Sequence, residues 1–262
     1  MTWTAKVVLV TGGASGIGAA LCSALADAGA LVHAGDLKPD GVADSRVNGV
    51  ALDVTDAEAF RAVVDKIATK HGRIDLLINN AGIGSAGEIR DVELSTWRRA
   101  IEVNTMGVIH GVDAVYRRML EQGSGQIINV ASGAGLCPRP GMVPYATSKA
   151  AVIGLSNSLR PEAAHYGIRI NCACPGYIAT NIMANTEYSG VDREGLQAAI
   201  PLRAMTATRC AELILKGAER NRGLIPVSAA TRFEYLLTRY MPWLALRIAA
   251  FRATKFREHR ST

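Results

Sequence analysis

The chain has 262 residues, of which 49% are hydrophobic and 5% aromatic, and its formal net charge is +6 at pH 7. This length suits one α/β domain with a large core. No run of about 18 apolar residues and no signal-peptide pattern occurs, so we expect neither a membrane-spanning helix nor secretion. The five histidines and five cysteines lack metal-ligand spacing, so we expect no metal site, reduced thiols and a cytoplasmic location.

Short apolar segments rich in β-branched residues alternate with longer helical segments along the chain. We expect strands at 6–10, 30–35, 48–52, 74–79, 126–131, 167–172 and 223–227. We expect helices at 16–28, 56–71, 95–122, 144–166 and 207–220. This alternation predicts an α/β fold, a doubly wound parallel sheet of about seven strands. No linker or repeat divides it, so we place one domain at 1–231 and a C-terminal extension at 232–262.

A glycine-rich turn follows the first predicted strand. Glycines at 12, 16 and 18 come after Thr11 and open a helix rich in Ala and Leu. Such glycines let the backbone turn tightly and approach a pyrophosphate, which the N–H groups of the helix start can bind. A turn without a ligand is the alternative. We expect dinucleotide contacts from Gly12, Ser15, Gly16, Ile17 and Gly18.

Asp36 lies at the end of the second predicted strand, about twenty residues past the glycines. An acid at this position can hydrogen-bond the adenosine ribose hydroxyls and would repel a 2′-phosphate. Ser15 offers no positive charge to offset the acid, so the sequence favours NAD over NADP, although Lys38 could soften the preference. The alternative is that Asp36 only opens a loop.

Tyr145 and Lys149 are four residues apart, which places them on one face of a predicted helix. A free tyrosine titrates near ~10, and a nearby cation lowers its pKa toward the working range. Tyr145 could then take a proton from an alcohol or give one to a carbonyl. Taken singly, Tyr145 could equally be a core aromatic residue and Lys149 a solvated lysine.

Together these segments resemble the short-chain dehydrogenase/reductase family from about Lys6 to Thr180. The matching segments are Thr11–Gly18, Leu52–Val54, Asn79–Gly82, Asn104, Ser132, Tyr145-x-x-x-Lys149 and Pro175–Gly176. Ser132 lies thirteen residues before Tyr145, the interval that the family uses, whereas Ala131 stands where many relatives carry a second serine. The resemblance implies a Rossmann-like fold and hydride transfer between NAD(P) and an alcohol or ketone.

The resemblance also implies residue roles. Tyr145 would be the general acid/base, and Lys149 would lower its pKa and hold the nicotinamide ribose. Ser132 would hydrogen-bond the substrate oxygen. Asn104 would hold a helix bend and a proton-relaying water. Further cofactor contacts would come from Asp53, Val54, Asn80, Ala81, Gly82, Pro175, Gly176, Ile178 and Thr180.

In this family the segment at about 182–202 covers the substrate. Here it is polar and irregular, so we expect a mobile lid. Met142, Val143 and Met183 flank the expected site and indicate an apolar pocket. We therefore expect a lipophilic secondary alcohol or ketone as the small-molecule substrate, of steroid, retinoid or fatty type. An NAD-binding sensor or scaffold without turnover, or an isomerase or dehydratase on the same fold, are the alternatives.

The extension 232–262 contains two amphipathic helical patterns separated at Pro242. Seven basic residues and two acids give it +5 of the chain's net +6. It could dock on a partner subunit in a homo-oligomer, a tetramer or dimer, or lie on an anionic membrane surface. The sequence slightly favours docking in an oligomer. No motif that reads nucleic acid accompanies the basic residues, so we expect no nucleic-acid partner.

Overall fold

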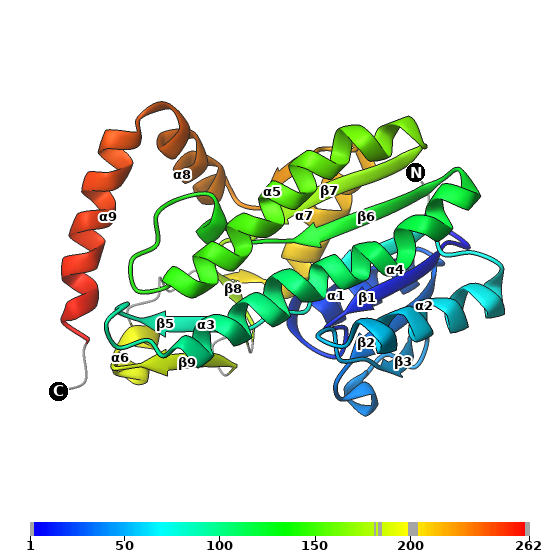
Figure 1. The fold of residues 1–262 in the computed structure, drawn as a ribbon, viewed down its shortest axis with the longest axis horizontal. Coiled ribbons are helices and arrows are strands. Elements are labelled where there is room, and N and C mark those ends of the chain that lie inside the picture. The colour runs from blue at the N-terminus through cyan, green and yellow to red at the C-terminus, as the bar shows by residue number, and fades with distance from the viewer. Residues whose placement is uncertain (1–2, 181, 183–184, 199–203, 260–262) are drawn as a thin grey trace.

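A seven-stranded sheet, parallel throughout, forms the centre of the protein (Figure 1). The structure is a computed structural model that describes residues 3–180, 182, 185–198 and 204–259. The strands are β1 Val7–Thr11, β2 Leu31–Asp36, β3 Asn48–Ala51, β4 Leu76–Asn79, β6 Gly125–Val130, β7 Ile168–Cys174 and β11 Leu224–Pro226. Their order is β11-β7-β6-β4-β1-β2-β3. The predicted doubly wound fold is confirmed.

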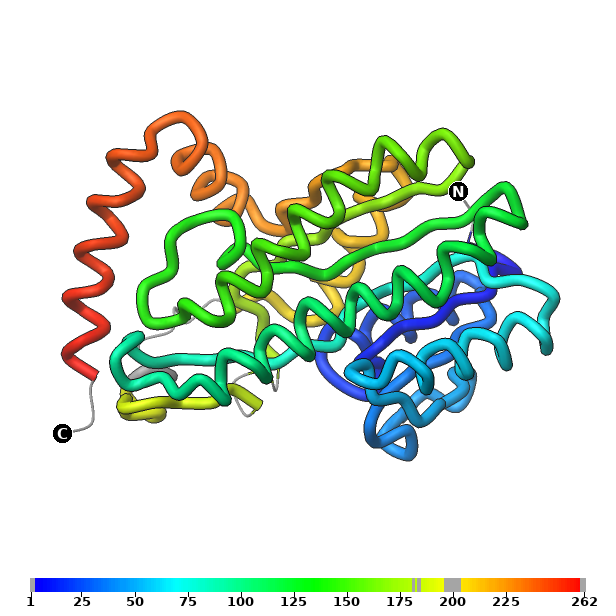
Figure 2. The backbone as a smooth tube through the Cα atoms, viewed as in Figure 1, coloured from blue at the N-terminus to red at the C-terminus, as the bar shows by residue number. Residues whose placement is uncertain are grey.

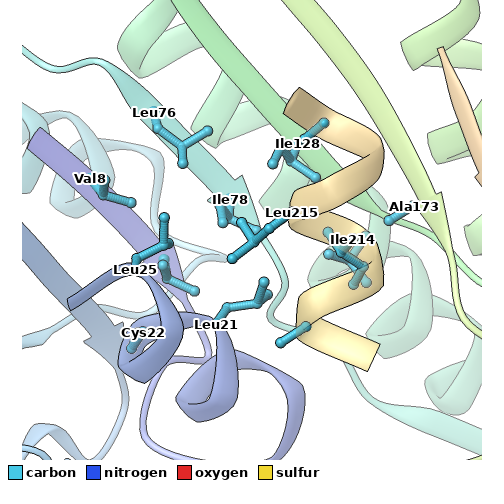
Figure 3. Packing of buried hydrophobic residues seen from close by; sticks show 14 of the residues in the cluster. Val8, Leu21, Cys22, Leu25, Leu76, Ile78, Ile128, Ala173, Ile214 and Leu215 are labelled. Atoms are coloured by element: carbon cyan, nitrogen blue, oxygen red, sulfur yellow. The ribbon is translucent and has the colours of Figure 1, made fainter. Parts of the chain in front are cut away.

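Helices cover both faces of this sheet. In chain order, the helices of the described residues are α1 Gly16–Asp27, α2 Ala57–His71, α3 Leu94–Ile101, α4 Gly107–Gln122, α5 Val143–His165, α6 Arg193–Ala198, α7 Ala207–Glu219, α8 Ala229–Tyr240 and α9 Pro242–Arg257. Helices α1 and α7 pack on one face, where Leu21 and Ile214 meet Val8 of β1 (Figure 3). Helices α2 and α4 pack on the other face, where Phe60 and Val115 meet Leu9. Alternate β1 residues thus enter opposite cores, as a strand buried on both faces requires.

Several local elements differ from the sequence-based expectation. The helix predicted over 95–122 is interrupted by a π-helical turn at Glu102–Met106. Two short strand pairs lie outside the main sheet: β5 Gly84–Gly87 with β9 Thr186–Ser189, and β8 Ile178–Ala179 with β10 Met205–Thr206. The segment at 182–202, which we predicted to be irregular, therefore contains β9 and α6. Strand β9 forms because it pairs with β5, about a hundred residues earlier in the chain. Part of that segment, Met183 included, lies outside the described residues.

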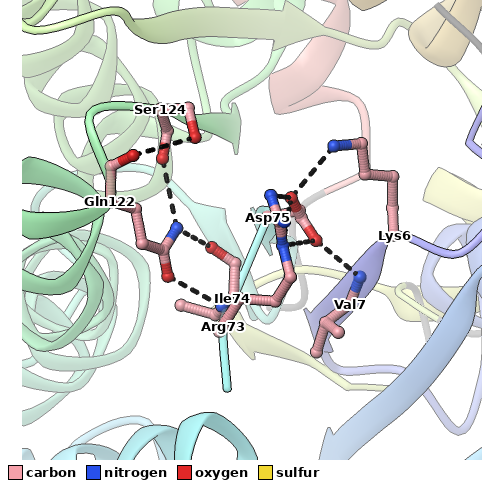
Figure 4. Close-up of polar contacts among 7 residues, drawn as sticks. All are labelled: Lys6, Val7, Arg73, Ile74, Asp75, Gln122 and Ser124. Carbon is pink, nitrogen blue, oxygen red and sulfur yellow. Dashed lines mark hydrogen bonds and ion pairs between the residues drawn. The ribbon is translucent and has the colours of Figure 1, made fainter. Parts of the chain in front are cut away.

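The amino ends of β1 and β4 are joined by a buried carboxylate (Figure 4). Asp75 accepts hydrogen bonds from the backbone N–H of Val7 at 3.0 Å and from the Lys6 Nζ at 3.0 Å. It also accepts one from the Arg73 Nε at 2.9 Å. The Gln122 side chain closes the same edge by bonding both the N–H and the C=O of Ile74. These contacts fix the sheet at the edge opposite the predicted site.

We expect Asp75→Asn to destabilise the protein at neutral pH. Burial acts to raise the Asp75 pKa, but the hydrogen bonds from Arg73, Val7 and Lys6 outweigh it and lower the pKa below 3.8. The ionised carboxylate therefore stabilises the fold above that pH, and the contribution disappears as the pH falls through the lowered pKa. Urea unfolding should show a loss of about 1–3 kcal/mol at pH 7 that shrinks toward acid.

The matched control is Asp65→Asn, which removes an exposed ion pair with Arg118. We expect a loss of less than about 1 kcal/mol, because water screens that pair. Equal losses in the two variants, or a loss for Asp75→Asn that does not change with pH, would contradict the role given to Asp75.

Candidate active site

One cavity of about 400 Å³ collects nearly all the predicted site residues. It is lined by Gly12, Ser15, Gly16, Ile17, Asp36, Asp53, Val54, Asn80, Ala81, Gly82, Ser132, Tyr145, Lys149, Pro175, Gly176, Ile178 and Thr180. Gly18 and Asn104 do not line the cavity. Residues of the lining directly follow β1, β4, β6 and β7, because parallel strands bring their carboxyl ends to one edge of the sheet.

The glycine loop between β1 and α1 has the geometry of an anion site. Gly16 has a φ of +54°, which favours glycine. A Cβ on Gly18 would lie 2.0 Å from the carbonyl oxygen of Gly12, so only glycine allows the loop to close this tightly. Ser15, which precedes α1, makes no capping hydrogen bond with its side chain, so the first N–H groups of the helix remain available to a phosphate.

Thr11 and Asn80 hold this loop in place. The Thr11 Oγ1 accepts hydrogen bonds from the backbone N–H groups of Asn80 and Ala81, both at 3.0 Å. The Asn80 Nδ2 donates in return to the carbonyl oxygens of Thr11 at 3.0 Å and Gly12 at 3.3 Å. Asn80 therefore supports the loop as well as lining the cavity.

Two carboxylates mark the end of the cavity that suits an adenosine. The Asp36 side chain accepts hydrogen bonds from the backbone N–H groups of Ala14 and Lys38, each at 3.1 Å. These contacts hold the carboxylate at the wall beside the glycine loop. Asp53 is fixed by the backbone N–H of Thr55 at 2.9 Å and by its hydroxyl at 2.7 Å. The glycine cradle, the uncapped helix start and the fixed Asp36 fit a dinucleotide.

Tyr145 and Lys149 lie side by side on α5 at the inner end of the cavity. Both side chains are buried, and the Ser132 side chain lies close enough to the Tyr145 phenol to lower its pKa. The Lys149 Nζ donates to the carbonyl oxygen of Val130 at 3.0 Å and lies 5.9 Å from the centre of the Tyr145 ring. The structure thus places Ser132, Tyr145 and Lys149 in the lining of one cavity. The Ser132 Oγ also accepts from the backbone N–H of Ala134 at 3.1 Å.

The ionisation of this pair differs from the expectation. Burial raises the Tyr145 pKa above 10, and the interaction with Ser132 offsets only part of that rise. Burial also lowers the Lys149 pKa to about 8. The predicted lowering of the Tyr145 pKa by Lys149 is therefore wrong for this structure, because burial decides the shift and Lys149, which donates to the Val130 carbonyl oxygen, is not among the groups that lower it.

Asn104 lies in the π-helical turn, fully buried behind the cavity wall. Its Oδ1 accepts from the backbone N–H of Ile83 at 2.9 Å, and its Nδ2 donates to the Ile83 carbonyl oxygen and to the Ser148 Oγ, both at 3.0 Å. A Cβ on Gly82 would lie 3.0 Å from this Oδ1 and 3.2 Å from the Lys149 Nζ. Asn104 thus lies within the helix bend and packs near Lys149 across Gly82.

The cavity extends past Tyr145 into a region that the sequence only partly revealed. Met142 lines it, whereas Val143 is exposed and does not line it. Lining residues outside the predicted set of site residues are Leu37, Leu52, Ile83, Gly84, Arg99, Val103, Val130, Ala131, Gly133, Ala134, Arg139, Tyr177, Ile182, Asn185, Thr186 and Ala204. Arg139 is the most consequential of these, because it is an ion pair partner of Glu234 from α8. In the sequence, the only sign that Arg139 belongs to the site is its position seven residues after Ser132.

The described residues contain no group of three or more His, Cys, Asp or Glu that could hold a metal ion. Their helices include none long and apolar enough to cross a membrane. All five cysteines are free, and Cys137 alone among them is partly exposed.

Comparisons with known proteins agree with this geometry. Probable oxidoreductase EphD of Mycobacterium tuberculosis is 34% identical over 255 residues, covering 90% of this chain but only 43% of that protein. The 3-oxoacyl-[acyl-carrier-protein] reductase FabG of Thermotoga maritima is 40% identical over 185 residues, covering 67% of this chain and 75% of that protein. A short-chain dehydrogenase/reductase structure from Burkholderia phymatum in complex with NAD has a TM-score of 0.85 at 27% identity, covering 93% of this chain and 96% of that one. The family model of short chain dehydrogenases matches residues 6–189, and the chain therefore belongs to this family of oxidoreductases.

Proposed function

We propose that this oxidoreductase transfers a hydride between NAD(H) and a lipophilic secondary alcohol or ketone. The observation that carries the proposal is the buried group of Ser132, Tyr145 and Lys149 at one end of a cavity whose other end is the glycine loop. Both halves of a dehydrogenase site therefore open into the same space. A sensor without turnover has no use for a buried phenol and ammonium beside the cofactor site.

The substrate oxygen would lie between the side chains of Ser132 and Tyr145. A bound nicotinamide dinucleotide would supply the acceptor or donor of the hydride. In reduction Tyr145 gives its proton to the ketone oxygen, and in oxidation its phenolate takes the proton of the alcohol. The raised Tyr145 pKa keeps the phenol protonated at neutral pH, so the site as it stands suits proton donation to a ketone. Ser132 would hydrogen-bond the oxygen as charge develops on it.

Lys149 and Asn104 would assist Tyr145 without touching the substrate. Lys149 would hold the nicotinamide ribose. It would also pass protons between the Tyr145 phenol and solvent through a water near Asn104. Support comes from the contact of Gly82 with both residues and from the Lys149 pKa of about 8, which lets the ammonium exchange a proton near neutral pH. Asn104 acts as a positioning residue, because its amide is bonded to Ile83 on both sides.

A preference for NAD over NADP rests on Asp36. Its carboxylate is fixed by two backbone N–H groups, so it cannot swing away from an incoming 2′-phosphate. Leu37, the neighbouring residue in the cavity wall, is apolar and offers such a phosphate no partner. These features favour the free ribose hydroxyls of NAD.

The lipophilic substrate is supported by the wall beyond Tyr145. Met142, Tyr177 and Ile182 line it, and the charge of Arg139 is balanced by Glu234. A fatty substrate is favoured by the name of the relative from Thermotoga maritima, a 3-oxoacyl reductase. We also propose that residues 1–231 are the catalytic unit and that the long helices α4 and α5 pair subunits into a dimer or tetramer.

Tyr145→Phe should abolish turnover and leave NAD binding within about twofold of the wild type, because only the phenolic proton donor is lost. The loss in kcat should reach ~10²–10⁴-fold. NADH formation from secondary alcohols, and NADH consumption with the matching ketones, would be followed for a panel from short aliphatic to steroidal compounds. Normal turnover by the variant would refute the role of Tyr145. NAD binding by the wild type without turnover across the panel would favour a sensor.

Asp36→Ser combined with Leu37→Arg should shift the preference toward NADP. The change removes the fixed negative charge and adds a cation that can bind the 2′-phosphate. We expect the ratio of kcat/KM for NAD to that for NADP to fall by roughly 10–100-fold. The exposed Asp40, just outside the cavity wall, provides the control substitution Asp40→Ser. An unchanged ratio in the double variant would show that Asp36 does not select the cofactor.

Lys149→Met should lose activity and weaken NAD binding, yet gain stability at neutral pH. The folded protein must bury a charged ammonium whose pKa has fallen from 10.5 to about 8. The gain should be largest below pH 8 and should vanish as the pH rises to 10.5, where the lysine is neutral in both states. Urea unfolding should show that the free energy of unfolding rises by about 1–3 kcal/mol at pH 7. The exposed control Lys66→Met should change it little. A variant that is less stable at pH 7 would contradict this account.

A further inference from the structure

Helices α8 and α9 form a hairpin at the periphery of the molecule, with α9 running along its edge (Figures 1 and 2). Large apolar side chains on this hairpin point into solvent with exposed fractions of 40–72%. We define the outer apolar face by these residues: Phe233, Leu236, Tyr240, Met241, Trp243, Leu246 and Phe251. The inner side of α9 contains the buried Ala245 and Ala249 together with the half-buried Leu244, Ile248 and Phe256. The seven residues of the outer apolar face remain exposed although this inner side is packed.

This concentration is unusual for the protein itself. Seven of the fifteen exposed large hydrophobic residues in the described part of the chain fall between residues 233 and 251. Exposed apolar residues that stand singly are normal on a protein surface. A contiguous group of them marks a surface that contacts another apolar phase or molecule.

The hairpin is fixed in this orientation by contacts on its inner side. Glu234 of α8 pairs with Arg139 beside the cavity and with Arg252 of α9. Arg257 pairs with Glu88 at the loop after β5, and the backbone N–H of Asp192 donates to the carbonyl oxygen of His259 at 2.8 Å. Turning the hairpin to bury the outer apolar face against the body would break the contacts with Arg139, Glu88 and Asp192.

Positive charge borders the outer apolar face. Arg232 and Arg239 lie seven residues apart, on one side of α8, and Arg247 is exposed on α9. None of the three has an ion pair within the described residues. The acids Glu234 and Glu258 of the hairpin are both engaged, by Arg139 and Arg252 and by Lys255. The surface is therefore apolar and cationic without a free acid.

We propose that the outer apolar face docks on an anionic membrane surface, with α8 and α9 lying in the interface. Aromatic and aliphatic side chains would enter the acyl boundary while Arg232, Arg239 and Arg247 contact anionic headgroups. The sequence alone slightly favoured a second subunit as the occupant. The exposed position of the face and its unpaired arginines now favour the membrane. In a symmetric contact between two copies of this face, the arginines of one copy would lie near those of the other and repel them.

The proposal does not depend on the substrate, but it bears on access to the site. The ring of Phe256 on α9 lies against Gly141, next to the cavity wall at Met142 and Arg139. Docking the hairpin would therefore hold the substrate end of the cavity close to the lipid. A lipophilic substrate could then partition through the bilayer.

Sedimentation of the full chain with vesicles tests the proposal. The vesicles are phosphatidylcholine alone, or phosphatidylcholine with phosphatidylglycerol. We expect binding to the anionic vesicles that weakens with added salt. The variant Phe233→Ser/Trp243→Ser/Phe251→Ser should bind at least ~10-fold more weakly. The variant Arg232→Gln/Arg239→Gln/Arg247→Gln should bind roughly 100-fold more weakly, about fivefold for each arginine.

Two control variants carry the same kinds of change elsewhere. Leu31→Ser/Leu94→Ser/Tyr166→Ser removes exposed apolar groups that do not belong to the hairpin. A second control removes equal charge through Arg98→Gln/Arg117→Gln/Arg220→Gln, which tests whether net charge alone drives binding. Both controls should bind anionic vesicles as the wild type does, and NAD binding in solution should be the same in all variants.

Fluorescence gives an independent readout, since of the three tryptophans Trp243 is exposed, Trp97 on α3 is half-buried and Trp3 is buried. Emission should shift to the blue with anionic vesicles, and Trp243→Phe should remove the shift. A wild type that stays in the supernatant, or that binds no better than the hairpin variants, would overturn the proposal. So would a hairpin variant that changes from oligomer to monomer while the wild type ignores vesicles, because the occupant would then be a second copy. Turnover in solution is scored separately, so failure here leaves the proposed reaction intact.

Discussion

The parallel pairing of β1 with β4 is the constraint on which the site depends. Strands β1 to β3 continue in one direction from β1, whereas β4 and its successors lie on the other side, so the chain reverses between β1 and β4. The loops that leave the carboxyl ends of these two strands must diverge, which opens a crevice there. Asp75 fixes the pair at the amino end, and the two hydrogen bonds that Asn80 donates to Thr11 fix it at the carboxyl end.

Burial shifts the pKa values of the two titratable side chains at the inner end of this crevice. It opposes charge on both Tyr145 and Lys149, raising the pKa of the phenol and lowering that of the ammonium. The phenol therefore stays protonated, and the lysine loses its proton more readily than a free lysine does. A proton can then pass between such groups while the site carries little net charge. The interaction with Ser132 favours the phenolate, so the serine that we propose binds the substrate oxygen also adjusts the acidity of Tyr145.

Much of the fold and the cofactor end of the site could be predicted from the sequence, because both depend on local patterns. Alternating apolar segments located the seven strands, and the glycines before α1 and the spacing of Tyr145 and Lys149 located the two ends of the cavity. The pairing of β9 with β5 was not predictable, since a strand formed at residues 186–189 depends on a distant partner. The pKa of Tyr145 was mispredicted because burial, rather than the neighbouring charge, decides it.

Arg139 and Glu234 show the same limit and also connect the two surfaces of the protein. Neither residue belongs to a motif, and they are 95 positions apart, yet their pair joins the substrate wall to α8. Glu234 holds Arg252 of α9 with its second oxygen, so one carboxylate links the cavity wall to both helices of the hairpin. A force that moves the hairpin must therefore strain the wall beside Arg139. The half-buried carboxylate of Glu234 is therefore the structural link between the cavity wall and the hairpin that we propose docks on lipid.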